Sequence, residues 1–547
     1  MADKAGTDKT MTRPRLLFLH FGHATPLAIA LVSCGGESTQ AAHSVSPPVI
    51  ISAGADSSAT PAHSQSALRA VEPGDVDEQD AVLSPAPAQP QEPQLGSVSH
   101  FTWIYKTTNR KAQPIGYARP GTTVTLRSAE PLSGTDCQSG RWLAVKPTGF
   151  VCDDATITLG LDSELFRALS DVVRPRDHVL PYRYGYSTGA PMYGRFPSAS
   201  EREQEARQYG RVDKLPKNAK PRTGYEELAG YETLPGTDPT PDFALTELPR
   251  MRGYGAGLVR KSIPSGSLLS FARAVDFEGQ TFLLTPDLTL VPADRIRLFR
   301  ETSFRGVAIG GDIKLPIGWT RSVSREVFRK HDDGVMETTG ELWPPRTMLQ
   351  LTGVVHTHKG KRYHETREGT WIRNADVSVV GPSVVTPSML RDGERWIEFS
   401  ASAGTFTLYV GKEAVYATLA SPGRGGGAPS SRMSIEELVE GSFTPIGAFR
   451  VSFKTRSTTM TPEGVPNPQK HWVQDVPYTQ YLIRPIAIHA AYWHEDFGMP
   501  KSGGCINLSP LDAQHVFGWT DPPMPEEWSG VSSSSEMGVG TLVVIRR

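Results

Sequence analysis

The chain has 547 residues, enough at roughly 150 residues per domain for three or four domains with buried cores. Its 57 Lys and Arg nearly balance its 58 Asp and Glu, which argues against a general nucleic-acid-binding surface. The 45 Pro and 52 Gly indicate many turns and short strands rather than helical bundles, and no apolar run approaches the ~20 residues of a membrane-spanning helix. We therefore expect a mainly β protein whose body lies outside the membrane.

Residues 1–33 have the layout of a secretory signal peptide, with basic residues, a moderately apolar stretch and small residues before Cys34. The end of this stretch resembles a bacterial lipobox, in which the thiol of the cysteine carries a lipid. The resemblance implies a periplasmic lipoprotein anchored to the membrane through Cys34, and Gly35 favours the outer membrane. A signal without lipidation, or a chance cysteine, is the alternative.

Residues 34–98 contain no Phe, Tyr or Trp and are rich in Ser, Ala, Pro and Gln. Such a segment cannot bury enough apolar surface to offset the entropy lost on ordering it. We predict a disordered tether whose reach lets the folded domains act at a distance from the membrane.

Aromatic residues return at Phe101 and Trp103, and residues 99–158 contain short β-rich runs separated by Gly and Pro. This pattern looks like a small barrel similar to bacterial SH3-like domains. Cys137 and Cys152 lie within it. In an oxidising periplasm a disulfide between them would stabilise the fold by about 3 kcal/mol, and two unpaired buried thiols are the alternative.

Two further small β modules are predicted in the middle of the chain. Residues 182–240 have no clear period, so most of 159–300 has no fold assignment. A glycine turn followed by an aromatic strand residue occurs three times, which indicates repeated modules or a chance recurrence. The occurrences are Gly140–Leu143, Gly279–Leu284 and Gly369–Arg373. The second indicates a module at about 255–300, inside the region 159–300. The third indicates a module at about 345–382, inside the region 301–385.

Residues 390–547 show the clearest β pattern. Trp396–Phe399 and Phe406–Val410 alternate apolar and polar side chains on either side of a glycine turn, as in a hairpin. A helix is predicted after Ser509, because this serine can cap a helix and Pro510 suits its first position.

The densest group of reactive side chains surrounds Cys505. A thiol with a pKa of about 8.5 is only a few per cent thiolate at neutral pH, so a nucleophilic cysteine needs an imidazole within hydrogen-bond reach. His489 can be that base, and Gly503 and Gly504 let backbone N–H groups approach a developing oxyanion. A structural role as a small buried hydrophobic side chain is the alternative for Cys505.

The end of the chain, under a third of it, resembles the catalytic domain of the YkuD family of L,D-transpeptidases. Thr444–Phe449 matches the Thr-Pro-x-Gly-x-Phe strand of that family, His489 its base, and Ser502, Gly504, Cys505 and Asn507 its Ser-His-Gly-Cys-apolar-Asn/Arg signature. The resemblance implies a β-sandwich domain that acts on peptidoglycan stem peptides, with Cys505 as nucleophile and the backbone around Gly504 near the oxyanion. It further implies substrate contacts from Ser502, Gly503, Asn507 and the loop residues Tyr492, Trp493 and His494.

One position departs from the family, because Gly503 stands where its second histidine occurs. That histidine is not the base, so Cys505 and His489 keep their roles, and our hypothesis is that His494 fills the vacated space. We expect an L,D-transpeptidase that needs no metal or cofactor, releases D-Ala and passes the acyl group to an amine of another stem or of an envelope protein. A non-catalytic wall-binding lipoprotein and an L,D-carboxypeptidase are the alternatives.

Two other motifs carry weaker signals. His356, His358 and His364 lie close together on predicted strands, but no fourth ligand accompanies them, so solvated strand histidines are preferred to a zinc site. Gly423–Gly427 lacks the Lys-Ser/Thr of a phosphate loop and is interpreted as a flexible turn between strands.

Overall fold

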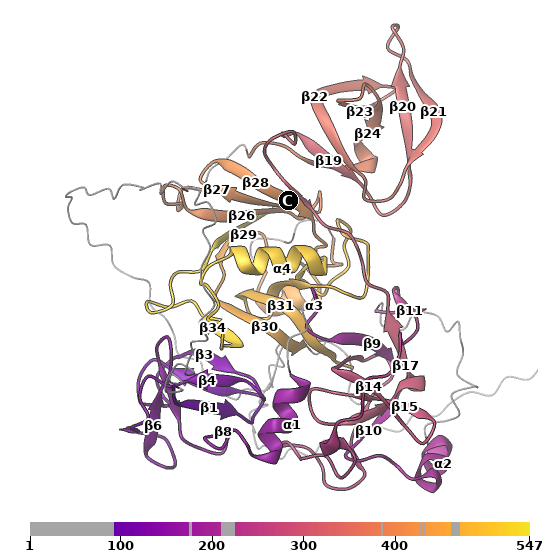
Figure 1. Cartoon of the computed structure of the whole chain (residues 1–547). Helices are drawn as coiled ribbons and strands as arrows, with labels where there is room; N and C mark the ends of the chain where they lie inside the picture. The colour runs from indigo at the N-terminus through magenta and orange to yellow at the C-terminus, as the bar shows by residue number, and fades with distance from the viewer. Residues whose placement is uncertain are drawn as a thin grey trace, which may run out of the picture. The chain divides into compact units, whose positions relative to one another are not determined.

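Strands dominate the computed structural model, and the predicted mainly β fold class is confirmed (Figure 1). The predicted signal peptide, Cys34 and most of the predicted tether lie outside the described residues. Among the described residues, no helix is both long and apolar enough to cross a membrane. The structure describes residues 92–173, 178–208, 225–383, 387–426, 429, 433–460 and 471–547, all within one unit, Ser33–Arg547.

The first region of the described chain consists of short strands stabilised by a disulfide between Cys137 and Cys152. The strands are β1 (Gln94–Ser97), β2 (Thr102–Tyr105), β3 (Pro114–Ala118), β4 (Thr123–Thr125), β5 (Leu132–Ser133), β6 (Arg141–Ala144), β7 (Phe150–Cys152) and β8 (Ile157–Thr158). Strand β1 lies within the predicted tether, 34–98, which corrects the boundary. It pairs with β4 and β8 and buries Leu95, so the folded part begins earlier than the return of aromatic residues indicates.

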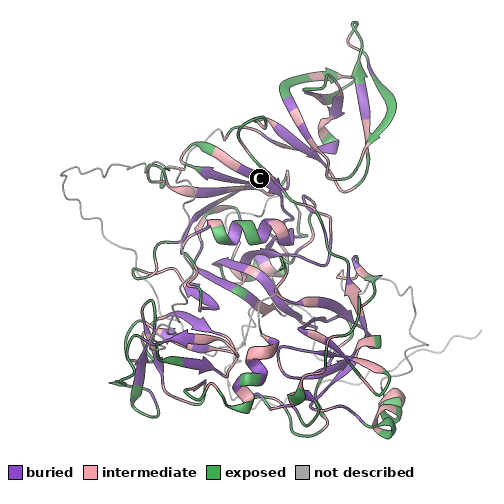
Figure 2. Ribbon diagram, viewed as in Figure 1, coloured by how far each residue is buried: buried purple, intermediate pink, exposed green. Residues whose placement is uncertain are grey.

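The described part of 159–300 combines strands with two helices. They are α1 (Glu164–Val172), β9 (Arg183–Ser187), β10 (Ala190–Tyr193), α2 (Ala199–Gln208), β11 (Ala229–Glu232), β12 (Val259–Ile263), β13 (Leu268–Phe271), β14 (Arg273–Phe277), β15 (Gln280–Leu284), β16 (Leu290–Pro292) and β17 (Ile296–Phe299). Strands β12 to β17 occupy the stretch predicted as a second module, but β9 and β10 join the same two sheets from outside it. Helix α2 buries none of its residues and carries the colours of exposed and intermediate residues in Figure 2.

A seven-stranded sheet follows, in the order β21-β20-β24-β23-β22-β19-β25. The strands of this region are β18 (Val307–Ala308), β19 (Ile317–Thr320), β20 (Arg325–Lys330), β21 (Met336–Trp343), β22 (Met348–His358), β23 (Lys361–Thr366), β24 (Trp371–Arg373) and β25 (Val377–Val380). The sheet includes the stretch 345–382 but begins earlier than that prediction, because β19 pairs with both β22 and β25.

The C-terminal region contains a six-stranded sheet, in the order β18-β28-β27-β26-β35-β29, and further strands beside it. Its elements are β26 (Arg395–Ser400), β27 (Thr405–Val410), β28 (Glu413–Leu419), α3 (Ile435–Glu440), β29 (Gly447–Arg450), β30 (Phe453–Met460), β31 (Val473–Ile483), β32 (Ile486–Ala490), β33 (Ile506–Leu508), α4 (Pro510–Trp519), β34 (Gly530–Ser532) and β35 (Leu542–Arg546). The predicted hairpin is confirmed as β26 and β27. The predicted helix is confirmed as α4, in which the Ser509 hydroxyl accepts a hydrogen bond from the Asp512 N–H.

The core of this region joins the six-stranded sheet, helix α4 and the strands β32 and β33. Phe399 and Val543 of the sheet pack in one cluster with Val516 of α4 and with Ile488 and Ile506 of the two strands. All five side chains are fully buried. Burial of this kind is the main favourable term in folding, and here it fixes the strands that carry the motif residues.

A buried lysine holds the C-terminal end of α4. Lys454 is 1% exposed, and its ammonium group donates hydrogen bonds to the carbonyl oxygens of Phe517 and Thr520, both at 2.7 Å. The last carbonyls of a helix lack partners within the helix and attract a cation. Lys454 therefore ties α4 to strand β30.

One long sheet connects regions that the sequence pattern predicts as separate modules. Its order is β11-β17-β9-β13-β31-β30-β34-β3-β2-β7-β6-β5. Strand β34 pairs with β3 of the first region, and β31 pairs with β13 of the second. Strands near the ends of the expected modules are therefore paired across module boundaries rather than left as exposed edges.

Candidate functional site

Most of the predicted site residues gather around one cavity of about 120 Å³ in the C-terminal region. Those that line it are His489, Trp493, His494, Ser502, Gly503, Cys505 and Asn507. Tyr492 and Gly504 are not among the lining residues. The structure thus brings the predicted nucleophile and the predicted base to one small space.

Two parallel strands and the loop between them position these residues. Strand β32 carries His489, residues 491–504 form a loop that we call the motif loop, and Cys505 lies directly before β33. The two strands pair in parallel with His489 opposite Asn507. This register brings the cysteine to the strand that carries the histidine.

Cys505 lies in mostly apolar surroundings. Its side chain is 7% exposed, and its sulfur lies 3.8 Å from the carbonyl oxygen of Pro485. It packs in a cluster with Tyr117, Phe453 and Tyr481. Since Tyr117 belongs to β3, the first region also contributes to the surroundings of the thiol.

The hydrogen bond of His489 determines which ring nitrogen can act as a base. Its Nδ1 lies 2.9 Å from the carbonyl oxygen of Ala490, which can only accept, so Nδ1 carries the proton and Nε2 keeps its lone pair. Burial lowers the pKa of His489 to about 4, and the imidazole is therefore neutral at pH 7. The histidine is in the state required to accept a proton through Nε2.

Hydrogen bonds fix the backbone immediately before Cys505. The Ser502 hydroxyl donates to the carbonyl oxygen of Cys505 and accepts from the Gly504 N–H at 3.1 Å. Gly504 has a φ of 127°, and a Cβ there would lie 2.9 Å from the carbonyl oxygen of Phe443, so this position requires glycine. The Gly504 N–H is thus bonded to Ser502, and the place of the backbone around Gly504 near the oxyanion stays a prediction.

The space beside Gly503 is open. Gly503 is exposed, and a Cβ built on it would meet no atom of the described chain within 4 Å beyond its sequence neighbours. His494 is 1% exposed, and its Nε2 lies 3.1 Å from the Asn507 amide nitrogen. Burial lowers the pKa of His494 to about 3, so it is neutral. The hypothesis that His494 fills the space beside Gly503 is therefore wrong, because its ring packs against Asn507 instead.

The two aromatic residues of the motif loop have different surroundings. The ring of Tyr492 stacks on that of Tyr184 in β9 with centroids 4.0 Å apart, and its hydroxyl donates to the carbonyl oxygen of Gln474. Its side chain is thus packed into the core, which corrects the predicted substrate contact. Trp493 lines the cavity, and its ring centroid lies 5.4 Å from that of Tyr225.

Sequence reasoning missed four polar or aromatic residues that line the same cavity, Tyr225, Arg424, Ser442 and Lys501. The Lys501 ammonium group pairs with Glu227 at 2.9 Å and also with Asp496. Arg424 lies in the glycine-rich turn that the sequence did mark. Tyr225 lies in a stretch without periodicity, so no local pattern could indicate it.

The histidines weighed as zinc ligands have other partners. His356 Nε2 lies 2.8 Å from the carbonyl oxygen of Gly334, and His364 Nε2 lies 2.9 Å from the Asn374 side-chain oxygen. No group of three or more His, Cys, Asp or Glu that could hold a metal ion occurs in the part of the chain that the structure describes.

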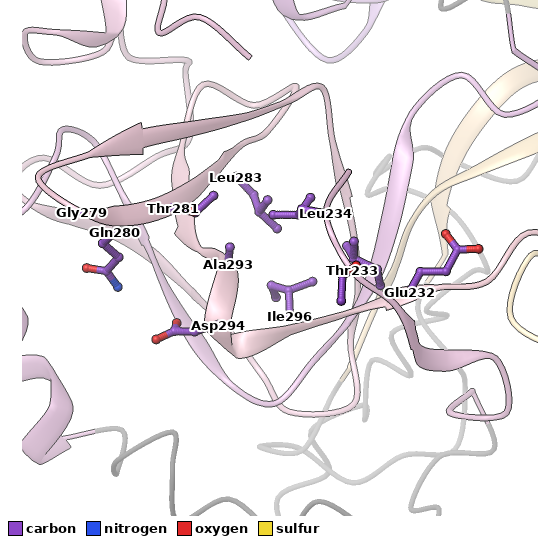
Figure 3. Close-up of a pocket in the computed structure, with 11 residues that line it drawn as sticks. Glu232, Thr233, Leu234, Gly279, Gln280, Thr281, Leu283, Ala293, Asp294 and Ile296 are labelled. Carbon is purple, nitrogen blue, oxygen red and sulfur yellow. The ribbon is translucent and has the colours of Figure 1, made fainter. Parts of the chain in front are cut away.

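A second, larger cavity of about 460 Å³ lies in the middle region (Figure 3). Its lining residues include the apolar Leu234, Leu283 and Ile296 and the acidic Glu232 and Asp294. Neither a cysteine nor a histidine is among its lining residues. The reactive side chains found in the first cavity are therefore missing from this one.

A cysteine, a neutral histidine and a signature asparagine around one cavity accord with a known catalytic domain. Residues 394–545 match the family model of the YkuD L,D-transpeptidase catalytic domain. The match coincides closely with the predicted domain, 390–547, and covers less than a third of the chain. No curated protein sequence matches the chain.

Solved structures of L,D-transpeptidases are similar to this chain at low identity. An L,D-transpeptidase of Enterococcus faecium is 20% identical over 30% of this chain and 54% of its own, with a TM-score of 0.20. One of Mycobacterium smegmatis is 20% identical over 46% of this chain and 89% of its own, with a TM-score of 0.21. L,D-transpeptidase 3 of Mycobacterium tuberculosis is 18% identical over 44% and 93%, with a TM-score of 0.21. The chain spans about half the length of the Enterococcus faecium protein.

Proposed function

We propose that the protein is a peptidoglycan L,D-transpeptidase in which Cys505 is the nucleophile and His489 the general base. The proposal is carried by the cavity that holds Cys505 and the neutral His489 within the region matching the YkuD domain. The Nδ1 hydrogen bond to Ala490 supports the assignment, because it leaves Nε2 able to accept the thiol proton.

The reaction takes place in two acyl-transfer steps. The thiol of Cys505 gives its proton to His489, and the sulfur attacks the carbonyl carbon between the third stem residue and the following D-Ala. The C–N bond breaks, D-Ala leaves with the proton, and a thioester remains. An amine of another stem or of an envelope protein then attacks the thioester, gives up a proton and restores the thiol. Neither step requires a metal or an organic cofactor.

The place of action is part of the same proposal. A signal peptide at 1–33, a lipid on Cys34 and a tether would hold the catalytic region in the periplasm at the outer membrane, within reach of peptidoglycan. Detergent-phase partitioning of the full-length protein, and its loss in Cys34→Ala, tests the anchor.

Replacing the nucleophile tests the reaction. Purified full-length protein incubated with a tetrapeptide stem should gain the mass of the tetrapeptide less that of D-Ala, and D-Ala should appear in solution. Cys505→Ala should abolish both signals while leaving the unfolding temperature close to that of the wild type, because a small side chain replaces a small one. Retention of D-Ala release by Cys505→Ala would show that the nucleophile is another group.

The open space beside Gly503 favours a second candidate, a non-catalytic lipoprotein that binds stem peptides. Labelling with a carbapenem followed by intact mass separates the two, since only a reactive thiolate should be acylated. Muropeptide mass spectrometry then separates cross-linked products from the shortened stems that an L,D-carboxypeptidase would release to water.

A further inference from the structure

Arg424 projects from a turn that the backbone on both sides holds in place. Its N–H donates to the carbonyl oxygen of Ser502 at 2.8 Å, and the Lys501 N–H donates to the carbonyl oxygen of Pro422 at 2.9 Å. On the other side, the Gly423 N–H donates to the hydroxyl of Thr444 at 2.8 Å. The turn therefore lies between the motif loop, which leads to Cys505, and the segment that contains the Thr-Pro-x-Gly motif.

The glycines of this turn are required by close packing rather than by flexibility. A Cβ on Gly423 would lie 2.1 Å from the carbonyl oxygen of Ser442, and a Cβ on Gly425 would lie 2.4 Å from that of Gly441. Both distances are shorter than any real contact, so another residue would displace the backbone. At Gly423 and Gly425 this corrects the interpretation of a flexible turn, and Arg424 between them is presented from a fixed position. A Cβ on Gly426 would meet nothing closer than 3.9 Å, and Gly427 lies outside the described residues.

The charges around the cavity make Arg424 distinct. Arg424 and Lys501 are its cationic lining residues, and no Asp or Glu lines it. Lys501 is neutralised by Glu227 and Asp496. In the described part of the chain no carboxylate pairs with Arg424, which is exposed. Arg424 thus lines the space that also contains the thiol of Cys505, and none of the described carboxylates pairs with it.

A guanidinium presents paired N–H donors in a fixed plane that matches the two oxygens of a carboxylate. We propose that Arg424 binds a carboxylate of the donor stem peptide and so selects donors with a free acid next to the scissile bond. The inference rests on the proposed transpeptidase function and names the substrate group that the site recognises. Two sources supply this chemistry, the terminal carboxylate of the leaving D-Ala and a side-chain carboxylate on the residue before the scissile bond.

The test compares three donor tetrapeptides with wild-type full-length protein, Arg424→Gln and Arg424→Lys. One donor has both carboxylates free, the second has the terminal carboxylate converted to an amide, and the third has the side-chain carboxylate converted to an amide. The readout is kcat/KM for release of D-Ala or its amide. Arg362→Gln is the matched control, since Arg362 on β23 is also exposed and lies outside the cavity lining.

A charge-assisted hydrogen-bond pair of this kind corresponds to a roughly 10- to 100-fold effect. For the wild type, amidation of the recognised carboxylate should lower kcat/KM by that factor. For Arg424→Gln, kcat/KM on the free-acid donor should already be lower by the same factor, and amidation of that carboxylate should cause no further loss. Arg424→Lys should retain part of the rate, and Arg362→Gln should stay within twofold of the wild type. The donor whose amidation lowers kcat/KM identifies which of the two carboxylates Arg424 binds.

Two results overturn the inference. Arg424→Gln could lose the same factor on all three donors, which would mean that Arg424 acts on the thiol rather than on the substrate. Arg424→Gln could also leave kcat/KM unchanged on all three donors, which would mean that Arg424 does not bind the substrate.

If wild-type protein releases D-Ala from no donor, the proposed function fails, and calorimetric binding of the free-acid tetrapeptide to Cys505→Ala decides the inference separately. Binding that is weakened at least tenfold by adding Arg424→Gln supports carboxylate recognition. Binding that is unchanged by that substitution, or undetectable, contradicts it.

Discussion

The low pKa of His489 bears on the proton transfer from Cys505 that we propose. An imidazole whose pKa is about 4 holds a proton weakly in the free protein. In the proposed transfer, a thiolate on Cys505 would favour the imidazolium once the proton has moved. The His489 Nδ1–H donates to the carbonyl oxygen of Ala490, so the proposed transfer would use Nε2.

Gly503 permits a direct test of the missing imidazole. Its Cβ position is open and its φ lies outside the left-handed region, so Gly503→His should fold with unchanged stability. If an imidazole there helps to shape the pocket, the rate of Cys505 acylation by a carbapenem should rise about tenfold, less than the 10²–10⁴-fold typical of a direct acid or base. Stopped-flow acylation rates and intact mass measure this effect.

Other outcomes for Gly503→His are informative. A wild type that reacts readily and a variant that reacts equally or more slowly would mean that the pocket functions with glycine. An unreactive wild type and an unreactive variant would favour the non-catalytic candidate. Gly518→His on α4, where a Cβ also meets no described atom within 4 Å, is the matched control for adding an imidazole.

The motif loop is held by side chains from outside the YkuD-matching region. The Glu495 carboxylate forms ion pairs with Arg300 at 2.8 Å and with Arg346 at 3.0 Å. Glu227 pairs with Lys501 and accepts a hydrogen bond from the Glu495 N–H at 3.1 Å. Residues from the middle of the chain thus fix both the beginning and the end of the loop that leads to Cys505.

Loosening this attachment should slow the chemistry more than it destabilises the fold. Glu227→Gln removes the charge that pairs with Lys501, and since both side chains are about one-third exposed, the free energy of unfolding should change by less than about 1 kcal/mol. Acylation of Cys505 should nevertheless slow by roughly 2- to 10-fold, because reactive groups tolerate little misplacement. Acylation kinetics and hydrogen exchange in residues 491–504 measure the two effects.

Glu203→Gln provides the control, because Glu203 forms an exposed ion pair with Arg207 on helix α2. It should change neither the acylation rate nor exchange in the motif loop. Equal slowing in both variants would indicate a general charge effect and would contradict a positioning role for Glu227.

Across the whole chain, a buried ion pair joins three regions that are far apart in sequence. Arg119, which follows β3, pairs with Asp475 of β31 and donates to the Ser457 hydroxyl of β30 at 2.6 Å. The Ser270 hydroxyl of β13 donates to the same aspartate at 2.6 Å. The aspartate is fully buried, so its charge depends on these partners.

Arg119→Met should lower the free energy of unfolding by about 3–5 kcal/mol, because it leaves the Asp475 carboxylate buried without its cation. The double variant Arg119→Met/Asp475→Asn should recover more than half of that loss, since it removes the uncompensated charge and keeps a side chain that tolerates the positive φ at this position. Denaturant unfolding of the three proteins gives the values. A loss below 1 kcal/mol in the single variant, or no recovery in the double variant, would contradict the role assigned to the pair.

The local sequence was sufficient to predict an element wherever the residues that specify the element are neighbours in the chain. The hairpin β26–β27 followed from alternation over a few residues on either side of a glycine turn. Helix α4 followed from Ser509 and Pro510, because a cap acts on the first turn only. The motif around Cys505 identified the region matching the YkuD domain, since its residues occur in a fixed order along the chain.

The tertiary structure alone decided what surrounds the thiol. Tyr225 and Arg424 reach the cavity through pairings between distant segments, and such pairings leave no period in the sequence. The same applies to Tyr492. Its ring packs on Tyr184 of β9 and its hydroxyl donates to Gln474 of β31, two strands that share a sheet with β13 between them. Backbone hydrogen bonds across strands depend on which strands meet, whereas the residue pattern of one strand specifies only which of its faces is buried.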